Sequence, residues 1–153
     1  MQTDQHQKDL EFMKAALDEA KTGLAEGGIP IGAVLVINNR IVGRGHNRRV
    51  QSGNPILHGE MDCLQNAGRL RARDYQMATL YTTLSPCAMC SGAILLYKIP
   101  RVVMAENKTF TGEEKHLIAR GVALVNLNLP EAISMMQKFI TEQPHLWDED
   151  IGV

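Results

Sequence analysis

The chain has 153 residues, of which 44% are hydrophobic and 22% charged, and its formal net charge is −1. This length and composition indicate one domain, residues 1–153, that is large enough to bury a hydrophobic core. The near-neutral charge gives no overall field that would attract the chain to nucleic acid or to an anionic membrane, and no run of 18 apolar residues predicts a transmembrane helix.

The first third of the sequence predicts one helix and a β-hairpin. Apolar residues recur at helical spacing over about residues 5–25, and the glycines and proline that follow end this helix. The apolar run 31–37 predicts a buried strand, and residues 38–40 predict the turn into a second strand, 41–46. The polar segment 47–55 is expected to be a loop.

A second helix is expected from His58 to about Gly68, because Leu57, Met61 and Leu64 lie on one helical face. The helix after the third strand is expected to start at Ser85, a favourable N-cap residue, with Pro86 at the first helical position. The remaining elements follow in order: a third strand (78–83), the helix ending before Pro100, a fourth strand (101–105), a loop (107–112), a short helix (113–120), a fifth strand (122–127), a last helix (130 to about 141) and a tail (145–151).

Strands that alternate with helices after an opening hairpin predict an α/β fold. The sheet is then mixed and mainly parallel, with helices on both of its faces. The helix between the fourth and fifth strands supplies the crossover that a parallel pair needs. Helices that begin directly after connecting segments can bring their N-termini together at one edge of this sheet.

The pair Cys87 and Cys90 is the strongest chemical signal in the chain. In a helix this spacing puts both sulfurs on one face, and a helix N-terminus favours thiolate over thiol. With His58 the pair makes three metal ligands, whereas a closed structural zinc site needs four. Three protein ligands leave one position for water, which is the pattern of catalytic zinc.

Two other interpretations of these residues stay open at this point. A small structural zinc knot would need a fourth ligand, and none is evident. A redox Cys-x-x-Cys pair would leave His58 and Glu60 without a role. The third cysteine, Cys63, lies about 140° around the helix from His58 and is expected to be a buried thiol that binds no metal.

The cysteine content also bears on location. An odd number of cysteines, two of them at metal-ligand spacing, favours a reducing compartment over a disulfide framework. The first eight residues are polar and lack the apolar segment of a signal peptide. We therefore expect a cytoplasmic protein.

The order His58-x-Glu60, then Pro86-Cys87-x-x-Cys90, matches the signature of zinc nucleobase deaminases. Nearly the whole chain resembles the small, fungal-type cytosine deaminases of the cytidine deaminase superfamily. The segments that carry the resemblance are 26–32, 43–47, 57–60, 80–87, 92–94 and 147–152. It implies a five-stranded sheet in the order 2-1-3-4-5 flanked by helices, and a homodimer.

The resemblance also implies an activity, the zinc-dependent hydrolysis of cytosine to uracil and ammonia. One Zn²⁺ per chain would be held by His58, Cys87 and Cys90. Glu60 would carry protons from water to the ring nitrogen and to the departing amine. A solvated helix carboxylate remains the alternative for Glu60.

The same resemblance implies the substrate-binding residues. Asn47 would donate to the base carbonyl, Ser85 would accept from the amine through its backbone carbonyl, and Asp150 would accept from the ring N1–H of a free base. The remaining members of the implied pocket are Gly59 and the apolar walls Ile31, Phe110 and Trp147. Residues 145–153 would form its lid.

Each of these assignments has an ordinary structural alternative. Asn47 is equally typical of a turn after a strand, Ser85 of an N-cap, and Asp150 of a tail charge. The three apolar walls could be simple core. Asp148 departs from the pattern, because the fungal enzymes have phenylalanine there, and its carboxylate either alters substrate preference or points to solvent.

Three further functions compete with cytosine deamination. Another base or small heterocycle, such as isocytosine or guanine, would use the same chemistry. A tRNA adenosine deaminase needs a basic surface, and although Arg69, Arg71 and Arg73 cluster, the net charge is −1, so no nucleic-acid partner is expected. A non-catalytic zinc-stabilised binding module would have no need of Glu60.

Overall fold

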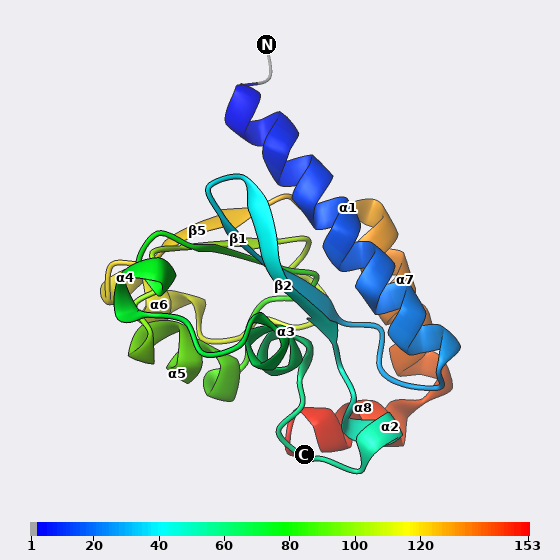
Figure 1. Cartoon of the computed structure of the whole chain (residues 1–153). Coiled ribbons are helices and arrows are strands. Elements are labelled where there is room, and N and C mark those ends of the chain that lie inside the picture. The colour runs from blue at the N-terminus through cyan, green and yellow to red at the C-terminus, as the bar shows by residue number, and fades with distance from the viewer. Residues whose placement is uncertain (1–2) are drawn as a thin grey trace.

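The computed structural model describes residues 3–153, so the first two residues of the polar N-terminal segment lie outside it (Figure 1). The strands are β1 (Gly32–Ile37), β2 (Arg40–His46), β3 (Thr79–Thr82), β4 (Arg101–Met104) and β5 (Ala123–Asn126). The helices are α1 (Asp4–Ala25), α2 (Arg49–Ser52), α3 (Gly59–Ala67), α4 (Ala72–Tyr75), α5 (Ala88–Leu96), α6 (Glu114–Ala119), α7 (Pro130–Glu142) and α8 (Pro144–Asp150).

Within residues 3–153 the strands form a five-stranded sheet in the order β2-β1-β3-β4-β5, which confirms the expected mixed sheet and its order. Strand β1 is antiparallel to both β2 and β3, whereas β3, β4 and β5 run parallel. The sheet is therefore mainly parallel only in its second half. The hairpin turn has positive φ at Asn38 and Asn39, 51° and 60°, as the two-residue turns of twisted hairpins require.

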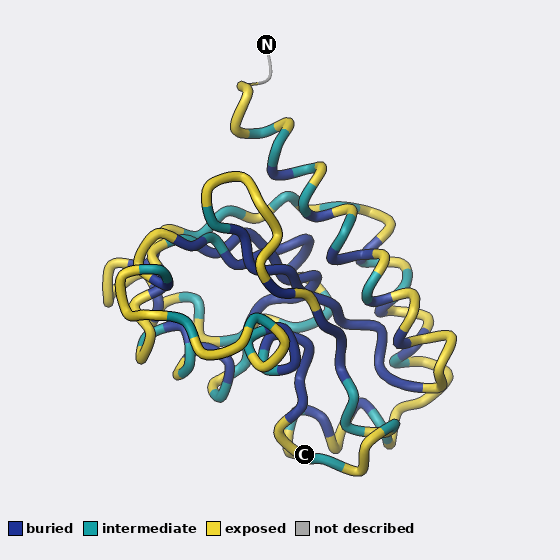
Figure 2. The backbone as a smooth tube through the Cα atoms, viewed as in Figure 1, coloured by how far each residue is buried: buried dark blue, intermediate teal, exposed yellow. Residues whose placement is uncertain are grey.

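Helices cover both faces of the sheet (Figure 1). On one face, Met13 of α1 and Ala132 of α7 pack with Val34, Tyr81 and Val103 of the strands. The strand residues adjacent to these point to the opposite face, because side chains alternate along a strand. That second core contains Leu35, Leu80, Val102, Ile94 of α5 and Leu117 of α6. Figure 2 shows β1, β3 and β4 buried between helices whose outer surfaces are exposed, whereas the edge strands β2 and β5 are largely exposed or half-buried.

A third cluster closes one end of the molecule, where it joins the C-terminal segment to the body. Trp147 of α8 and Phe139 of α7 are buried with Ile29, Ile31 and Leu84. Burying a side chain of this size contributes about 1.5–3 kcal/mol. The C-terminal segment is therefore packed into the core of the described chain, and α8 lies beside α2 (Figure 1).

The structure corrects four expectations about local elements. The expected loop 47–55 contains α2, and the expected tail forms α8; the short α4 was not predicted at all. Four-residue helices show too little of the helical period to be recognised. Pro144 is the first residue of α8, a position where its missing N–H costs nothing.

The fourth correction concerns the start of α5. Its N-cap is Cys87, and the first helical residue is Ala88, so Ser85 and Pro86 precede the helix. The Ser85 hydroxyl instead accepts from the Gly112 N–H at 2.9 Å and donates to Glu114 Oε2 at 2.5 Å. Ser85 therefore ties the start of α5 to the loop after β4.

Helix α3 also turns a different face inward from the one its apolar stripe indicates. The residues it buries are Gly59, Glu60, Asp62 and Cys63. Met61 and Leu64 are only half-buried and line a surface groove with Tyr75 and Tyr97. Among the described residues, no helix is long and apolar enough to cross a membrane.

Candidate metal centre and substrate cavity

Two helix starts bring the three predicted metal ligands together. His58 is the N-cap residue of α3, Cys87 is the N-cap residue of α5, and Cys90 lies in the first turn of α5. His58 Nδ1 lies 3.4 Å from Cys87 Sγ, and the ligand atoms of the three residues all lie within 4.8 Å of one another. His58, Cys87 and Cys90 are thus positioned to bind one metal ion.

The donor set fits zinc. Zn–S and Zn–N bonds of about 2.3 and 2.0 Å place tetrahedral ligands about 3.3–3.8 Å apart, close to the observed separation of His58 and Cys87. Two thiolates and one imidazole are preferred zinc ligands. The metal-binding group found in the described chain has three members, so a fourth coordination position is left for water or substrate.

The three ligands differ in protonation. A hydrogen bond with the Cys90 thiol and another with His58 outweigh burial and lower the pKa of Cys87 to about 4. Although burial acts in the opposite direction, contact with Cys87 and the charges of Asp150 and Glu60 raise the pKa of His58 to about 9. The hydrogen bond with Cys87 and burial raise the pKa of Cys90, so Cys87 carries the thiolate, and a bound metal would displace the protons of His58 and Cys90.

Cys63 behaves as a buried thiol. Its side chain donates to the Gly43 carbonyl at 3.5 Å, and burial raises its pKa well above the usual range. It is not a member of the metal-binding group of the described residues.

Glu60 is 4% exposed and lies on the inward face of α3, two residues after His58. Burial and the nearby Cys87 thiolate raise its pKa to about 7. A carboxyl group that is half-protonated near neutral pH can both accept and donate a proton. This environment contradicts the alternative of a solvated helix carboxylate.

Glu60 faces a small cavity that contains most of the predicted site residues. The space inside the cavity that a water-sized sphere can occupy is about 20 Å³. One water needs about 10–15 Å³, so a ligand larger than water can enter only if the lining side chains move apart. Its lining residues are Ile31, His58, Glu60, Leu84, Ser85, Cys87, Phe110, Trp147, Asp150 and Ile151.

Asp150 reaches this cavity from α8, although only three residues of the sequence follow it. Its Oδ1 accepts a hydrogen bond from Asn47 Nδ2 at 2.8 Å and lies 3.4 Å from His58 Nε2 and 3.8 Å from Arg49 Nη1. Burial raises its pKa, and the charges and hydrogen bonds of these three neighbours oppose that rise. The carboxylate is therefore buried beside a metal ligand, whereas Asp148 is exposed.

Two predicted substrate-binding residues do not line the cavity. Asn47 is fully buried and meets the site through Asp150. Gly59 lies against the backbone of Ile31, where a Cβ atom would be 3.0 Å from the Ile31 carbonyl oxygen. The apolar walls do come together, and the rings of Phe110 and Trp147 meet edge to face at 5.8 Å.

Sequence reasoning missed three residues at the site, namely Leu84, Ile151 and Arg49. Leu84 and Ile151 adjoin Ser85 and Asp150, so their place in the sequence was a usable signal. The Arg49 guanidinium donates to the Pro55 carbonyl at 3.1 Å and lies beside Asp150. Nothing in the local sequence distinguishes it from a surface arginine.

Comparison with known proteins gives one family. Residues 6–106 match the cytidine and deoxycytidylate deaminase zinc-binding region. A cytosine deaminase of Candida albicans (strain SC5314) is 54% identical over 145 residues, which cover 94% of this chain and 97% of that protein.

Two further comparisons are more remote. A tRNA-specific adenosine deaminase of Streptococcus pyogenes serotype M18 is 44% identical over 108 residues, covering 67% of this chain and 66% of that protein. Among solved structures, one from a study of tRNA:A34 deaminases that edit the wobble position of transfer RNA is 27% identical. It matches with a TM-score of 0.70, covering 82% of this chain and 99% of that one.

Proposed function

We propose that this chain, which belongs to the cytidine and deoxycytidylate deaminase family, hydrolyses free cytosine to uracil and ammonia. The observation that carries the proposal is the placement of the buried Asp150 carboxylate in a small cavity next to Glu60 and the metal-binding group. Similarity to a cytosine deaminase along almost the entire chain supports it independently.

His58, Cys87 and Cys90 would hold one zinc ion per chain. The chemistry that zinc supplies when bound is the activation of water at neutral pH. Reduced thiols are needed for this binding, which agrees with the cytoplasmic location we propose.

Glu60 would move the protons. The water oxygen forms a bond to ring carbon C4, and the bond from C4 to the exocyclic nitrogen breaks. Glu60 takes a proton from the water and delivers it to ring nitrogen N3, then passes the second proton to the amine, which departs as ammonia. A pKa of about 7 suits a group that must accept and donate in turn.

The remaining residues would bind and orient the base. Asn47 would donate to the base carbonyl, the Ser85 backbone carbonyl would accept from the amine, and Asp150 would accept from N1–H. Gly59 would let the start of α3 approach the backbone of Ile31, a wall of the cavity. Ile31, Phe110 and Trp147 would enclose the ring, with residues 145–153 acting as a lid that excludes bulk water.

The lid also supports a free base over a nucleoside or an RNA. In cytidine the N1 nitrogen carries ribose, so Asp150 would lose its donor and the sugar would meet the lid. Sites built around a substrate N–H reject analogues without it by about 10⁴–10⁵-fold.

Ammonia release from cytosine, isocytosine, 5-methylcytosine, guanine, adenine and cytidine by the zinc-loaded protein tests the proposal. We expect cytosine to have the highest kcat/KM and cytidine to be lower by about 10⁴-fold. A higher kcat/KM for guanine or isocytosine than for cytosine would show that this other base is the preferred substrate. Comparable kcat/KM values for cytosine and cytidine would contradict the role of the lid.

We also propose that the protein is a homodimer. Large apolar side chains of α5 and its surroundings are exposed in the single chain, with Leu96 at 70% and Ile56 at 52%. Ile56 lines the surface groove beside α3, and so does Tyr97, the residue that follows Leu96. Light scattering that gives the 16.9 kDa mass of one chain at micromolar concentration would contradict the dimer.

A further inference from the structure

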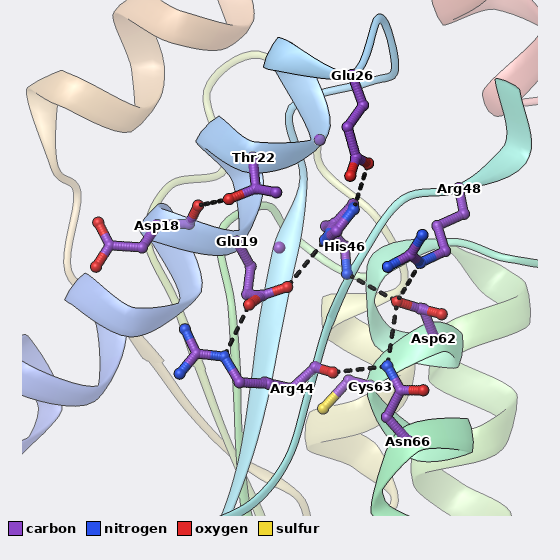
Figure 3. Close-up of polar contacts among 12 residues, drawn as sticks. Asp18, Glu19, Thr22, Glu26, Arg44, His46, Arg48, Asp62, Cys63 and Asn66 are labelled. Carbon is purple, nitrogen blue, oxygen red and sulfur yellow. Dashed lines mark hydrogen bonds and ion pairs between the residues drawn. The ribbon is translucent and has the colours of Figure 1, made fainter. Parts of the chain in front are cut away.

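A partly buried polar cluster beside the site has no role in the mechanism described above (Figure 3). We call it the His46 cluster and define it by four residues. Glu19 lies on α1 and Glu26 caps its C-terminal end, His46 is the last residue of β2, and Asp62 lies on the inward face of α3. The cluster thus joins three elements that are distant in the sequence.

The His46 ring is fixed from the side of α1. Its Nδ1 lies 2.9 Å from Glu19 Oε1 and its Nε2 lies 2.8 Å from Glu26 Oε1, and the side chain is 4% exposed. Helix α1 has Gly23 where the ring lies against it, and a Cβ atom there would be 3.0 Å from His46 Cδ2. The ring therefore has little freedom to move.

The backbone of the same segment is fixed from the side of α3. Asp62 Oδ2 accepts from the His46 N–H at 3.1 Å and from Arg48 Nε at 3.2 Å (Figure 3). This reach depends on close contact of β2 with α3, because a Cβ atom at Gly45 would lie 2.6 Å from Asp62 Oδ2. One buried carboxylate thus holds two residues that are separated by a single position.

The residue between them is Asn47. Its Nδ2 donates to Asp150, its Oδ1 accepts from the Arg49 N–H at 3.0 Å, and its own N–H donates to the Ile31 carbonyl at 2.9 Å. The Asn47 amide meets the cavity at Asp150, and it keeps this position only while the 46–48 backbone keeps its place relative to α3. Asp62 is on that helix and holds that backbone.

We propose that Asp62 is a positioning residue that acts through His46 and Arg48 to place the Asn47 amide for substrate. The inference rests on the proposed function for the role of Asn47 toward the base. Asp62 itself does not line the cavity. Its effect must therefore reach the substrate through the 46–48 backbone, and this dependence can be measured.

The test is a double-mutant cycle in the zinc-loaded protein with cytosine as substrate. Asp62→Ala is expected to raise KM about tenfold or more, with a smaller change in kcat and an unchanged zinc content, because a small misplacement of a binding group is costly. In an Asn47→Ala background the same substitution should change kcat/KM by less than about twofold, since residues acting through one another are not additive. Equal effects in both backgrounds would overturn the proposal.

Asn66→Ala is the matched control. The Asn66 amide donates to the Arg44 carbonyl at 2.8 Å and, at the longer distance of 3.4 Å, to Asp62 Oδ2. This substitution therefore removes a hydrogen bond between α3 and β2 together with the weakest of the three hydrogen bonds that Asp62 Oδ2 accepts. It leaves both contacts of Asp62 with residues 46 and 48 in place. It should lower stability with little change in KM, whereas a KM increase equal to that of Asp62→Ala would show a general effect of loosening α3.

Two further measurements keep the test decisive. Amide hydrogen exchange of residues 46–48 needs no substrate, and it should accelerate in Asp62→Ala but not in Asn66→Ala. If wild-type protein turns over no base, the proposed function fails, and unchanged exchange would then overturn the positioning role as well. If Asp62→Ala does not fold, His46→Gln enters the same cycle, because it loosens this segment from the α1 side.

Discussion

Asp9 and Asp150 are both buried carboxylates, 2% and 7% exposed, but their surroundings differ. Asp9 of α1 accepts hydrogen bonds from Tyr81 at 2.7 Å, from Arg101 at 2.9 and 2.6 Å, and from Gln5. Asp150 accepts one side-chain hydrogen bond, from Asn47, and its cationic neighbours lie at 3.4 Å or beyond.

The pKa values move in opposite directions. Burial raises the pKa of both carboxyls, but for Asp9 the hydrogen bonds from Arg101, Tyr81 and Gln5 outweigh burial and lower it overall. For Asp150 burial dominates and the pKa is raised. A structural carboxylate is one whose lone pairs are already satisfied, whereas a carboxylate with spare acceptor capacity beside a cavity is free to meet a ligand.

The largest expected effect comes from Glu60. Like Asp150, it is a buried carboxyl that lines the cavity and has a raised pKa. Glu60→Gln keeps the shape of the side chain but cannot accept and return a proton. We expect turnover of cytosine to fall by at least about 10²–10⁴-fold, with zinc content and melting temperature near those of wild type. Steady-state kinetics and elemental analysis measure these quantities, and a loss below about threefold would exclude Glu60 as the proton carrier.

Asp150 and Asp148 make a matched pair on α8 with opposite exposure. Asp150→Asn should lower kcat/KM for cytosine about 10–100-fold, because the amide at N1–H presents either a weaker acceptor or a repelling donor. Asp148→Asn should change it by less than about twofold, as expected for an exposed side chain. If both variants change kcat/KM for cytosine by the same factor, Asp150 does not bind the N1–H of the base.

Asp9→Asn tests the structural side of the comparison. Breaking a fully buried ion pair costs about 3–5 kcal/mol, and because the Arg101 side chain is 23% exposed we expect a smaller loss, about 2–3 kcal/mol. Urea unfolding measures this loss, and kcat/KM should stay within about twofold of wild type. Glu131→Gln is the control, since its pair with Lys21 is exposed on both sides and should contribute under about 1 kcal/mol.

The smallest expected effect is the pH dependence of the stability lost in Asp9→Asn. The folded-state pKa of Asp9 is lowered, so between its folded and unfolded pKa values the folded protein binds fewer protons than the unfolded chain. The contribution of Asp9 to stability is therefore fully present above the unfolded pKa. The stability difference between wild type and Asp9→Asn should therefore be constant above about pH 5 and shrink as the pH falls below about 4. A difference that grows on acidification, measured by urea unfolding, would contradict the lowered pKa.

Much of the fold and the metal group could be predicted from the sequence, because both depend on short-range patterns. The alternation of strand and helix signals predicted the elements, and the family resemblance predicted the order of the sheet. His58, Glu60, Cys87 and Cys90 were recognisable because each lies within three residues of another member of the motif. Local geometry alone places the members of each pair, His58 with Glu60 and Cys87 with Cys90, near one another.

The tertiary structure decided the contacts between residues that are remote in the sequence. Asn47 meets Asp150 across 103 positions, and Arg101 meets Asp9 across 92, and no local pattern marks such pairs. The buried face of α3 differed from its apolar stripe because Gly43 and Gly45 let β2 approach the helix there. Hydrophobic periodicity shows which residues are apolar, but only the packing of one element on another determines which buried carboxylates have their hydrogen bonds satisfied.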